Sequence, residues 1–179
     1  MSLEILARQN PWWQETATLR DDPALAEYDG APFKWEPPYL RAPRSSKRVY
    51  FSDPLAFHSF RSWVFGYDHG WRATEEFLAD PNNVGYLVES MIASHLQRNF
   101  GTRIFYWRNG QEIDFVVFRE EKRVALIEVK YQTKINPDNA KALVQQGGGI
   151  LLTKNQFLYN SEKNVLAIPV PFFLALLQD

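Results

Sequence analysis

The sequence contains no cysteine, and this absence excludes several classes of function at once. Disulfide bonds, thiolate zinc sites and cysteine nucleophiles all need a thiol. Neither sign of charge dominates, because 20 lysines and arginines face 21 aspartates and glutamates, for a net charge of -1. The chain therefore has no general positive field for nucleic acid or anionic lipid. A lack of cysteine fits a reducing compartment, and we expect a cytoplasmic protein.

Long hydrophobic runs are also missing. The most apolar stretch, residues 165–177, is interrupted by Pro169 and Pro171 and is typical of a buried strand followed by a short helix. Residues 1–10 lack the basic and then apolar pattern of an export signal, so we expect no membrane partner. With 179 residues, 45% of them hydrophobic and 23% charged, the chain has the size and balance of one domain with a modest appendage.

Proline and tryptophan are concentrated near the N-terminus. The first third of the chain holds seven of the 11 prolines and three of the six tryptophans. Because proline fixes φ and lacks an N–H donor, residues 9–43 are predicted to form an extended arm. Its tryptophans should dock on this chain's core or on a partner, which includes a second copy. We predict an arm and linker over residues 1–44 and a globular domain over residues 45–179.

The globular part is predicted to be α/β (α+β), with a mixed sheet flanked by helices. Hydrophobic periodicity and capping residues predict helices over residues 54–65 (with an apolar stripe in the core), 72–79, from Asn82 or Asn83 to about 101, and 137–146. Alternation and turn residues predict strands over residues 49–51, 104–107, 112–118, 123–131, 150–153 and about 165–170, before a short last helix. Asn109 and Gly110 predict a tight hairpin turn.

Two of these strands carry charged residues on apolar faces. The period of two places Asp114 on the face of Val116 and Phe118, and Glu128 on the face of Lys130. If residues 119–123 form the loop, the antiparallel register sets Asp114 opposite Glu128.

Opposed carboxylates on a half-buried face destabilise a sheet unless a proton or a cation compensates them. Oxygen ligands without cysteine or a histidine cluster favour Mg²⁺ or Mn²⁺. Lys130 would then orient a water or stabilise negative charge on a phosphate. Glu89 adds a third carboxylate if its helix packs on these strands. The alternative is that these groups form solvated surface ion pairs.

The ordered set of Glu89, then Asp114 after Ile113, then Glu128-Val129-Lys130 resembles the PD-(D/E)xK nuclease-like superfamily. The resemblance implies a restriction-endonuclease-like core with extra N-terminal helices and an extended arm. It also implies that Asp114, Glu128 and the backbone carbonyl of Val129 bind Mg²⁺, that Lys130 positions the attacking water, and that Glu89 assists the metal. Ile113 stands where the superfamily motif has proline.

A second resemblance covers nearly the whole chain. Its motifs are QNPWW (9–13), APFKW (31–35), YFSDP (50–54), GYLVE (85–89), YW (106–107), EIDFV (112–116), IEVKY (127–131) and LTK (152–154). With these motifs the sequence is similar to the start and the C-terminal domain of prokaryotic AAA-type P-loop ATPases whose C-terminal domain of unknown function has a nuclease-like fold.

The nucleotide-binding module of those ATPases is missing. No G-x-x-x-x-G-K-[ST] motif occurs, so we expect neither ATP binding nor ATPase activity. A deletion near residues 40–47, natural or engineered, would explain the joining of the two ends.

The residues lead to two hypotheses. The first is a nuclease-like domain that hydrolyses DNA phosphodiesters with Mg²⁺ or Mn²⁺. The second is a non-catalytic regulatory module of an ATPase that binds nucleic acid or protein. Lys134 and Lys154 follow the predicted site and are candidate phosphate contacts, although solvated lysines are the simpler alternative. A third interpretation is a remnant whose arm only mediates association.

Overall fold

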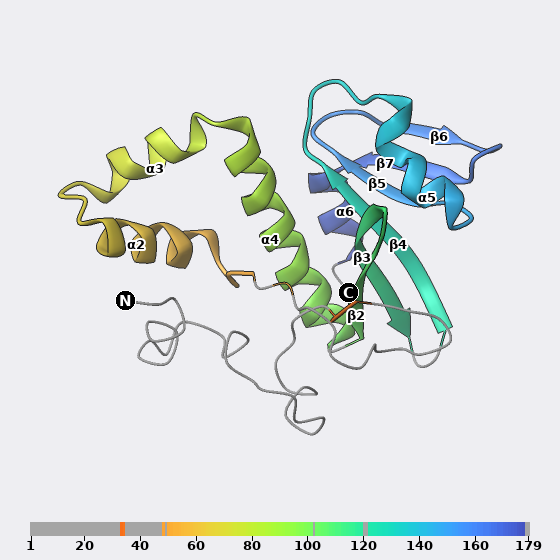
Figure 1. Cartoon of the computed structure of the whole chain (residues 1–179), viewed down its shortest axis with the longest axis horizontal. Helices are drawn as coiled ribbons and strands as arrows, with labels where there is room; N and C mark the ends of the chain where they lie inside the picture. The colour runs from red at the N-terminus through yellow and green to blue at the C-terminus, as the bar shows by residue number, and fades with distance from the viewer. Residues whose placement is uncertain (1–32, 35–47, 49, 102, 120–121, 178–179) are drawn as a thin grey trace.

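Three consecutive antiparallel strands form the centre of the structure (Figure 1). They are β2 (Ile104–Asn109), β3 (Gln111–Arg119) and β4 (Lys122–Lys130). The computed structural model describes residues 33–34, 48, 50–101, 103–119 and 122–177, so most of the predicted arm lies outside the described residues. The hairpin turn predicted at Asn109 and Gly110 is confirmed, since Asn109 pairs with Gln111 and Gly110 has a φ of 69°.

Parallel strands extend this centre into a seven-stranded mixed sheet of order β1-β2-β3-β4-β5-β7-β6. β5 (Gly149–Thr153) lies parallel to β4, and β7 (Val165–Pro169) lies parallel to β5. The two edges are the short strands β6 (Leu158–Asn160) and β1 (Phe33–Lys34), the second of which pairs in parallel with β2. The predicted mixed sheet with flanking helices, an α+β arrangement, is confirmed.

Helices cover both faces of the sheet (Figure 1). On one face, α4 (Pro81–Phe100) and α6 (Val170–Leu176) pack on apolar side chains of β3, β4 and β5. On the other face lie the 3-10 helix η2 (Pro137–Ala140) and α5 (Lys141–Gln145), where Leu143 is fully buried. Within the described ranges, no helix is both long and apolar enough to cross a membrane.

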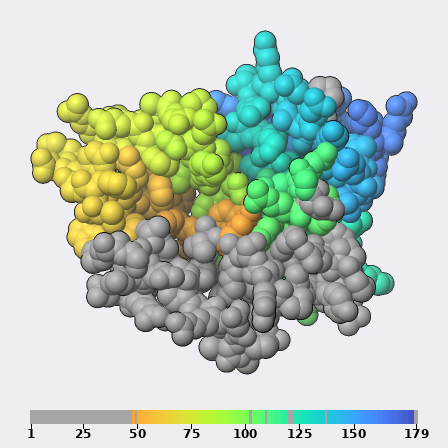
Figure 2. Space-filling view, in the orientation of Figure 1, coloured from red at the N-terminus to blue at the C-terminus, as the bar shows by residue number. Residues whose placement is uncertain are grey.

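A helical hairpin of α2 (Pro54–Phe65) and α3 (Gly70–Leu78) stands beside α4, and Figure 2 shows it as the yellow end of the molecule. Asp53 caps α2 by accepting hydrogen bonds from the N–H groups of Leu55 and Ala56. The apolar stripe predicted to be core is wrong for this helix. Leu55 and Trp63 are exposed, because among the described residues α2 packs chiefly on α3 and α4 rather than on the sheet.

Several element boundaries differ from the sequence predictions. Helix α4 begins at Pro81, one or two residues early, because Asp80 accepts a hydrogen bond from the N–H of Asn82 and caps the helix there. The strand predicted over residues 49–51 is wrong at Tyr50 and Phe51, which belong to no strand. The helix predicted over residues 137–146 is divided into η2 and α5. Strand β6 was not predicted, because three residues are too few to show an alternation.

Two β-bulges interrupt the regular pairing of the central strands. Between β2 and β3, Phe105 pairs with Val116 and Trp107 pairs with Ile113, so Asp114 and Phe115 together oppose Tyr106. A bulge of this kind interrupts strict alternation and turns an additional side chain toward one face.

The packing confirms this change of face. Ile113 packs with Val116 on the α5 face, whereas Phe115 packs on the α4 face. The prediction that Asp114 shares a face with Val116 is therefore wrong.

The second bulge lies between β3 and β4. The predicted pair of Val116 and Leu126 is confirmed, but Phe118 pairs with Arg123 instead of Val124. Val124 is the extra residue and is half exposed. The turn is shorter than the predicted loop, since Arg119 already pairs with Lys122. The regular pairing toward the site ends at Phe115 and Ile127, so Asp114 and Glu128 are the next residues along their strands.

The glycine loop before β5 provides a test of this packing. Both Gly147 (φ 91°) and Gly148 (φ 110°) have positive φ, but a Cβ on Gly148 would lie 2.1 Å from the carbonyl oxygen of Asn164, whereas one on Gly147 meets nothing within 4 Å. We expect Gly148→Ala to lower the free energy of unfolding by about 1–3 kcal/mol more than Gly147→Ala. Urea unfolding of both variants measures this, and equal losses would contradict the close approach.

Candidate active site

Asp114 lies in the bulge of β3 and is buried, with its carboxylate on the α4 side of the sheet. Its Oδ2 accepts a hydrogen bond of 2.8 Å from the backbone N–H of Val129, and its Oδ1 lies 2.9 Å from Nη1 of Arg48. Both carboxylate oxygens therefore have a donor. The bulge creates this arrangement, because strict alternation would turn Asp114 toward α5 and away from Glu89.

Glu128 and Lys130 form a second group on β4. Oε1 of Glu128 lies 2.5 Å from Nζ of Lys130, and Oε2 accepts a hydrogen bond of 3.3 Å from the backbone N–H of Asp114. Glu128 is buried, and its side chain has only 6% of its surface exposed. The predicted closeness of Asp114 and Glu128 is thus realised through a hydrogen bond from backbone to side chain.

Glu89 reaches the same region from the middle of α4, which packs on β3 and β4 as the sequence hypothesis required. Its Oε1 accepts a hydrogen bond from the hydroxyl of Tyr50 and one of 2.8 Å from Nη1 of Arg48. Serines on the same helix hold the segment after Tyr50: Ser90 Oγ donates to the carbonyl of Phe51 at 2.6 Å. Ser94 Oγ donates to the carbonyl of Ser52 at 2.9 Å.

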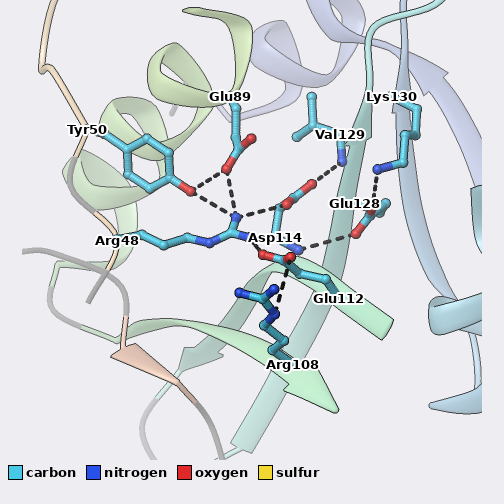
Figure 3. Close-up of polar contacts among 9 residues, drawn as sticks. All are labelled: Arg48, Tyr50, Glu89, Arg108, Glu112, Asp114, Glu128, Val129 and Lys130. Carbon is cyan, nitrogen blue, oxygen red and sulfur yellow. Dashed lines mark hydrogen bonds and ion pairs between the residues drawn. The ribbon is translucent and has the colours of Figure 1, made fainter. Parts of the chain in front are cut away.

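Arg48 lies at the centre of the cluster, although the sequence predicted no role for it in the site. One nitrogen, Nη1, contacts both Glu89 and Asp114, and Nη2 contacts Glu112 (Figure 3). The guanidinium carbon also lies 5.0 Å from the centre of the Tyr106 ring, within the range of a cation–π contact. A sequence signal existed, because Tyr50 begins the YFSDP motif and Arg48 precedes it by two residues, but only the fold brings this segment to α4 and β3.

The buried charges shift several pKa values. Burial and the neighbouring charge of Asp114 raise the pKa of Glu128 to about 7, although Lys130 opposes the shift. Burial and repulsion by Asp114 also raise the pKa of Glu89. Burial alone would lower the pKa of Arg48, but the attraction of Tyr50, Asp114 and Glu89 raises it overall. The pKa of Lys130 is raised in the same manner, chiefly by Glu128. The carboxylates therefore carry more negative charge than their surroundings readily compensate.

The donor chemistry of the site suits a hard divalent cation, since Glu89, Asp114 and Glu128 supply carboxylate oxygens and Val129 adds a backbone carbonyl in the same stretch of β4. The observed positions divide these donors into two groups. Glu89 and Asp114 face Arg48, whereas Glu128 faces Lys130 (Figure 3). Accordingly, no group of three acidic or histidine side chains placed to hold a metal is found among the described residues. A cation between Glu89 and Asp114 fits only where Arg48 now lies.

The two candidate phosphate contacts lie outside this cluster. Lys134 and Lys154 are both exposed, and Nζ of Lys154 lies 5.8 Å from the centre of the Tyr131 ring. Neither has an ion pair with the clustered carboxylates among the described contacts. Their proposed contact with nucleic acid stays a prediction.

The raised pKa of Glu128 predicts a dependence of stability on pH. Because the folded state holds this proton more tightly than the unfolded state, Glu128 contributes its full stability below pH 4.5 and loses it as the pH rises toward about 7. Glutamine does not ionise. We therefore expect the free energy of unfolding of Glu128→Gln to rise, relative to that of the wild type, by up to about 3 kcal/mol between pH 4.5 and pH 8. Urea unfolding at both pH values measures the change.

A matched control is Glu162→Gln, which alters an exposed glutamate between β6 and β7. It should show no such relative gain. If the difference in the free energy of unfolding between Glu128→Gln and the wild type is the same at both pH values, the pKa of Glu128 is not raised in the folded protein.

Comparison with known proteins places the site within a family. The family described as "Domain of unknown function (DUF4143)" matches residues 84–173, a range that includes Glu89, Asp114, Glu128 and Lys130 and leaves out Arg48 and Tyr50. Comparison with curated proteins gave no match, and neither did comparison with solved structures. The matched range is half of the chain and holds most of α4, the central strands and most of α6, and the chain belongs to the DUF4143 family.

Proposed function

We propose that this chain is a nuclease-like domain that hydrolyses DNA phosphodiester bonds with Mg²⁺ or Mn²⁺. The observation that carries the proposal is the joining of Asp114 to the pair formed by Glu128 and Lys130, through the 3.3 Å hydrogen bond from the Asp114 N–H. Buried carboxylates beside a lysine on neighbouring strands are an arrangement suited to metal-assisted phosphoryl chemistry. A surface ion pair would not need burial of Asp114 and Glu128, so the solvated alternative is less favoured.

The fold forms part of the proposal. A helix, three antiparallel strands, a helix and a parallel strand follow one another from α4 to β5. This order supports assignment to the PD-(D/E)xK type, in which a helix Glu and two strand positions form the site. Here Glu89 and Asp114 both contact Arg48, and the Asp114 N–H joins Glu128. The extra helices α2 and α3 precede that core. By its resemblance, the domain would be related to the C-terminal domain of an AAA-type ATPase. The chain itself would not hydrolyse ATP, because it contains no phosphate-binding loop motif.

Each residue of the site has a separate role in the proposed reaction. Asp114, Glu128 and the carbonyl of Val129 would hold the ion, with Glu89 in support. The bound ion supplies Lewis acidity and a more acidic water. Lys130, fixed by Glu128 at 2.5 Å, would orient the attacking water and stabilise negative charge on the phosphate with its ammonium group. Lys134 and Lys154 would contact phosphates along the strand.

A specific observation favours the second candidate, a non-catalytic module that binds nucleic acid or protein. Nη1 of Arg48 lies 2.8 Å from Glu89 and 2.9 Å from Asp114, so these carboxylates already have a cation. Such a site can persist as a structural ion-pair network in a domain that only binds.

Cleavage assays separate the two candidates. With Mg²⁺ or Mn²⁺ and supercoiled, linear and single-stranded DNA, the wild type should cleave at least one form. We expect Asp114→Asn and Lys130→Met each to reduce the rate about 100-fold or more, because each removes a charge that acts in the transition state. Lys163→Met is the control, since it removes an exposed lysine from the β6–β7 turn.

Equal rates in the wild type and in both site variants would contradict the enzyme proposal. Binding of DNA without cleavage, measured by fluorescence anisotropy, would instead support the module.

A further inference from the structure

One guanidinium lies where a divalent cation would be expected to bind. Nη1 of Arg48 is within 3 Å of Oε1 of Glu89 and Oδ1 of Asp114, at 2.8 Å and 2.9 Å, and Nη2 contacts Glu112 (Figure 3). These oxygens are the ones that a cation shared by the two carboxylates would need. Arg48 and a divalent ion therefore exclude each other from the same position.

The charge balance makes such an exchange favourable to an ion. Three carboxylates, Glu89, Glu112 and Asp114, surround one guanidinium, and the only other cation paired with them in the described contacts is Arg108, 4.0 Å from Glu112 and largely exposed. A divalent ion carries twice the charge of the guanidinium into the same low-dielectric surroundings. The carboxylates thus gain attraction when the ion replaces Arg48.

Arg48 is also placed where it can leave. It belongs to no helix or strand, and its side chain keeps 23% of its surface exposed. The segment is attached to α4 a few residues further along the chain. There the carbonyls of Phe51 and Ser52 accept hydrogen bonds from Ser90 and Ser94, respectively. In Figure 2 orange atoms from the part of the chain around the start of α2 are visible at the surface between the yellow and the green parts of the molecule. A swing of this side chain toward solvent requires no change in the sheet.

We propose that Arg48 is an internal cation that occludes a divalent-cation site formed by Glu89 and Asp114, and that the ion binds when the guanidinium moves out. The proposal rests on the proposed function and adds its regulation: the domain would be held inactive until the segment that carries Arg48 is displaced. Because Arg48 lies outside residues 84–173, the occluding group comes from the chain that precedes the family domain.

Binding of Mn²⁺ to the full chain tests this without any activity assay. Three proteins are compared: the wild type, Arg48→Met and Arg108→Met. Arg48→Met keeps an unbranched side chain and loses the charge. Arg108→Met removes a positive charge near Glu112 without opening the position between Glu89 and Asp114. Free Mn²⁺ is measured by electron paramagnetic resonance during titration. We expect Arg48→Met to bind Mn²⁺ about tenfold or more tightly than the wild type, and Arg108→Met to change the affinity much less. The double variant Arg48→Met with Asp114→Asn should lose the gain.

The outcomes separate this inference from the proposed function. If Arg48→Met and the wild type bind Mn²⁺ with equal affinity, Arg48 does not occlude the site and only the inference is overturned. If Arg48→Met is folded by circular dichroism and neither protein binds Mn²⁺, the metal-dependent function falls together with the inference.

A measurement on the wild type keeps the proposal testable if Arg48→Met does not fold. The side-chain NMR resonances of Arg48 should shift toward those of a solvated guanidinium when Mg²⁺ saturates the protein. Unchanged Arg48 resonances in the presence of bound Mg²⁺ would overturn the inference.

Discussion

The compensation of buried carboxylates is the constraint on which the site depends. Asp114 and Glu128 are buried next to each other, and Glu89 approaches them from α4. An ionised carboxylate that leaves water without a partner costs several kcal/mol, so every oxygen near this point needs a donor or a cation. The fold supplies the N–H groups of Val129 and Asp114, the hydroxyl of Tyr50, the ammonium of Lys130 and the guanidinium of Arg48.

The bulge in β3 determines which carboxylates meet. With strict alternation, Asp114 would project to the α5 face, among Val116 and Phe118. The two residues opposite Tyr106 turn Asp114 toward α4 instead, within reach of the cation that Glu89 also contacts. A one-residue irregularity in pairing therefore converts two separate strand carboxylates and a helix carboxylate into one electrostatic unit.

Much of the frame followed from local patterns. The α4 helix shows apolar spacing, a capping aspartate and a terminal glycine, and the central strands show alternation and the turn at Gly110, so their order was predictable. The candidate residues Glu89, Asp114, Glu128 and Lys130 were also predictable, because charge on otherwise apolar faces is unusual. Arg48 and Glu112 were not, since a basic residue in a polar stretch carries no local signal of the carboxylates it contacts.

The sequence by itself determined the type and order of most elements and the chemistry available to them: no thiol, no phosphate-binding loop, and oxygen and lysine groups on neighbouring strands. These properties depend on residue identity and short spacing. Only the tertiary structure decided that Asp114 faces α4, that Glu128 is held by Lys130, and that Arg48 lies between Glu89 and Asp114. Those outcomes depend on bulges and on contacts of Arg48 with residues that lie 41 and 66 positions further along the sequence. The periodicity of a single segment cannot predict such contacts.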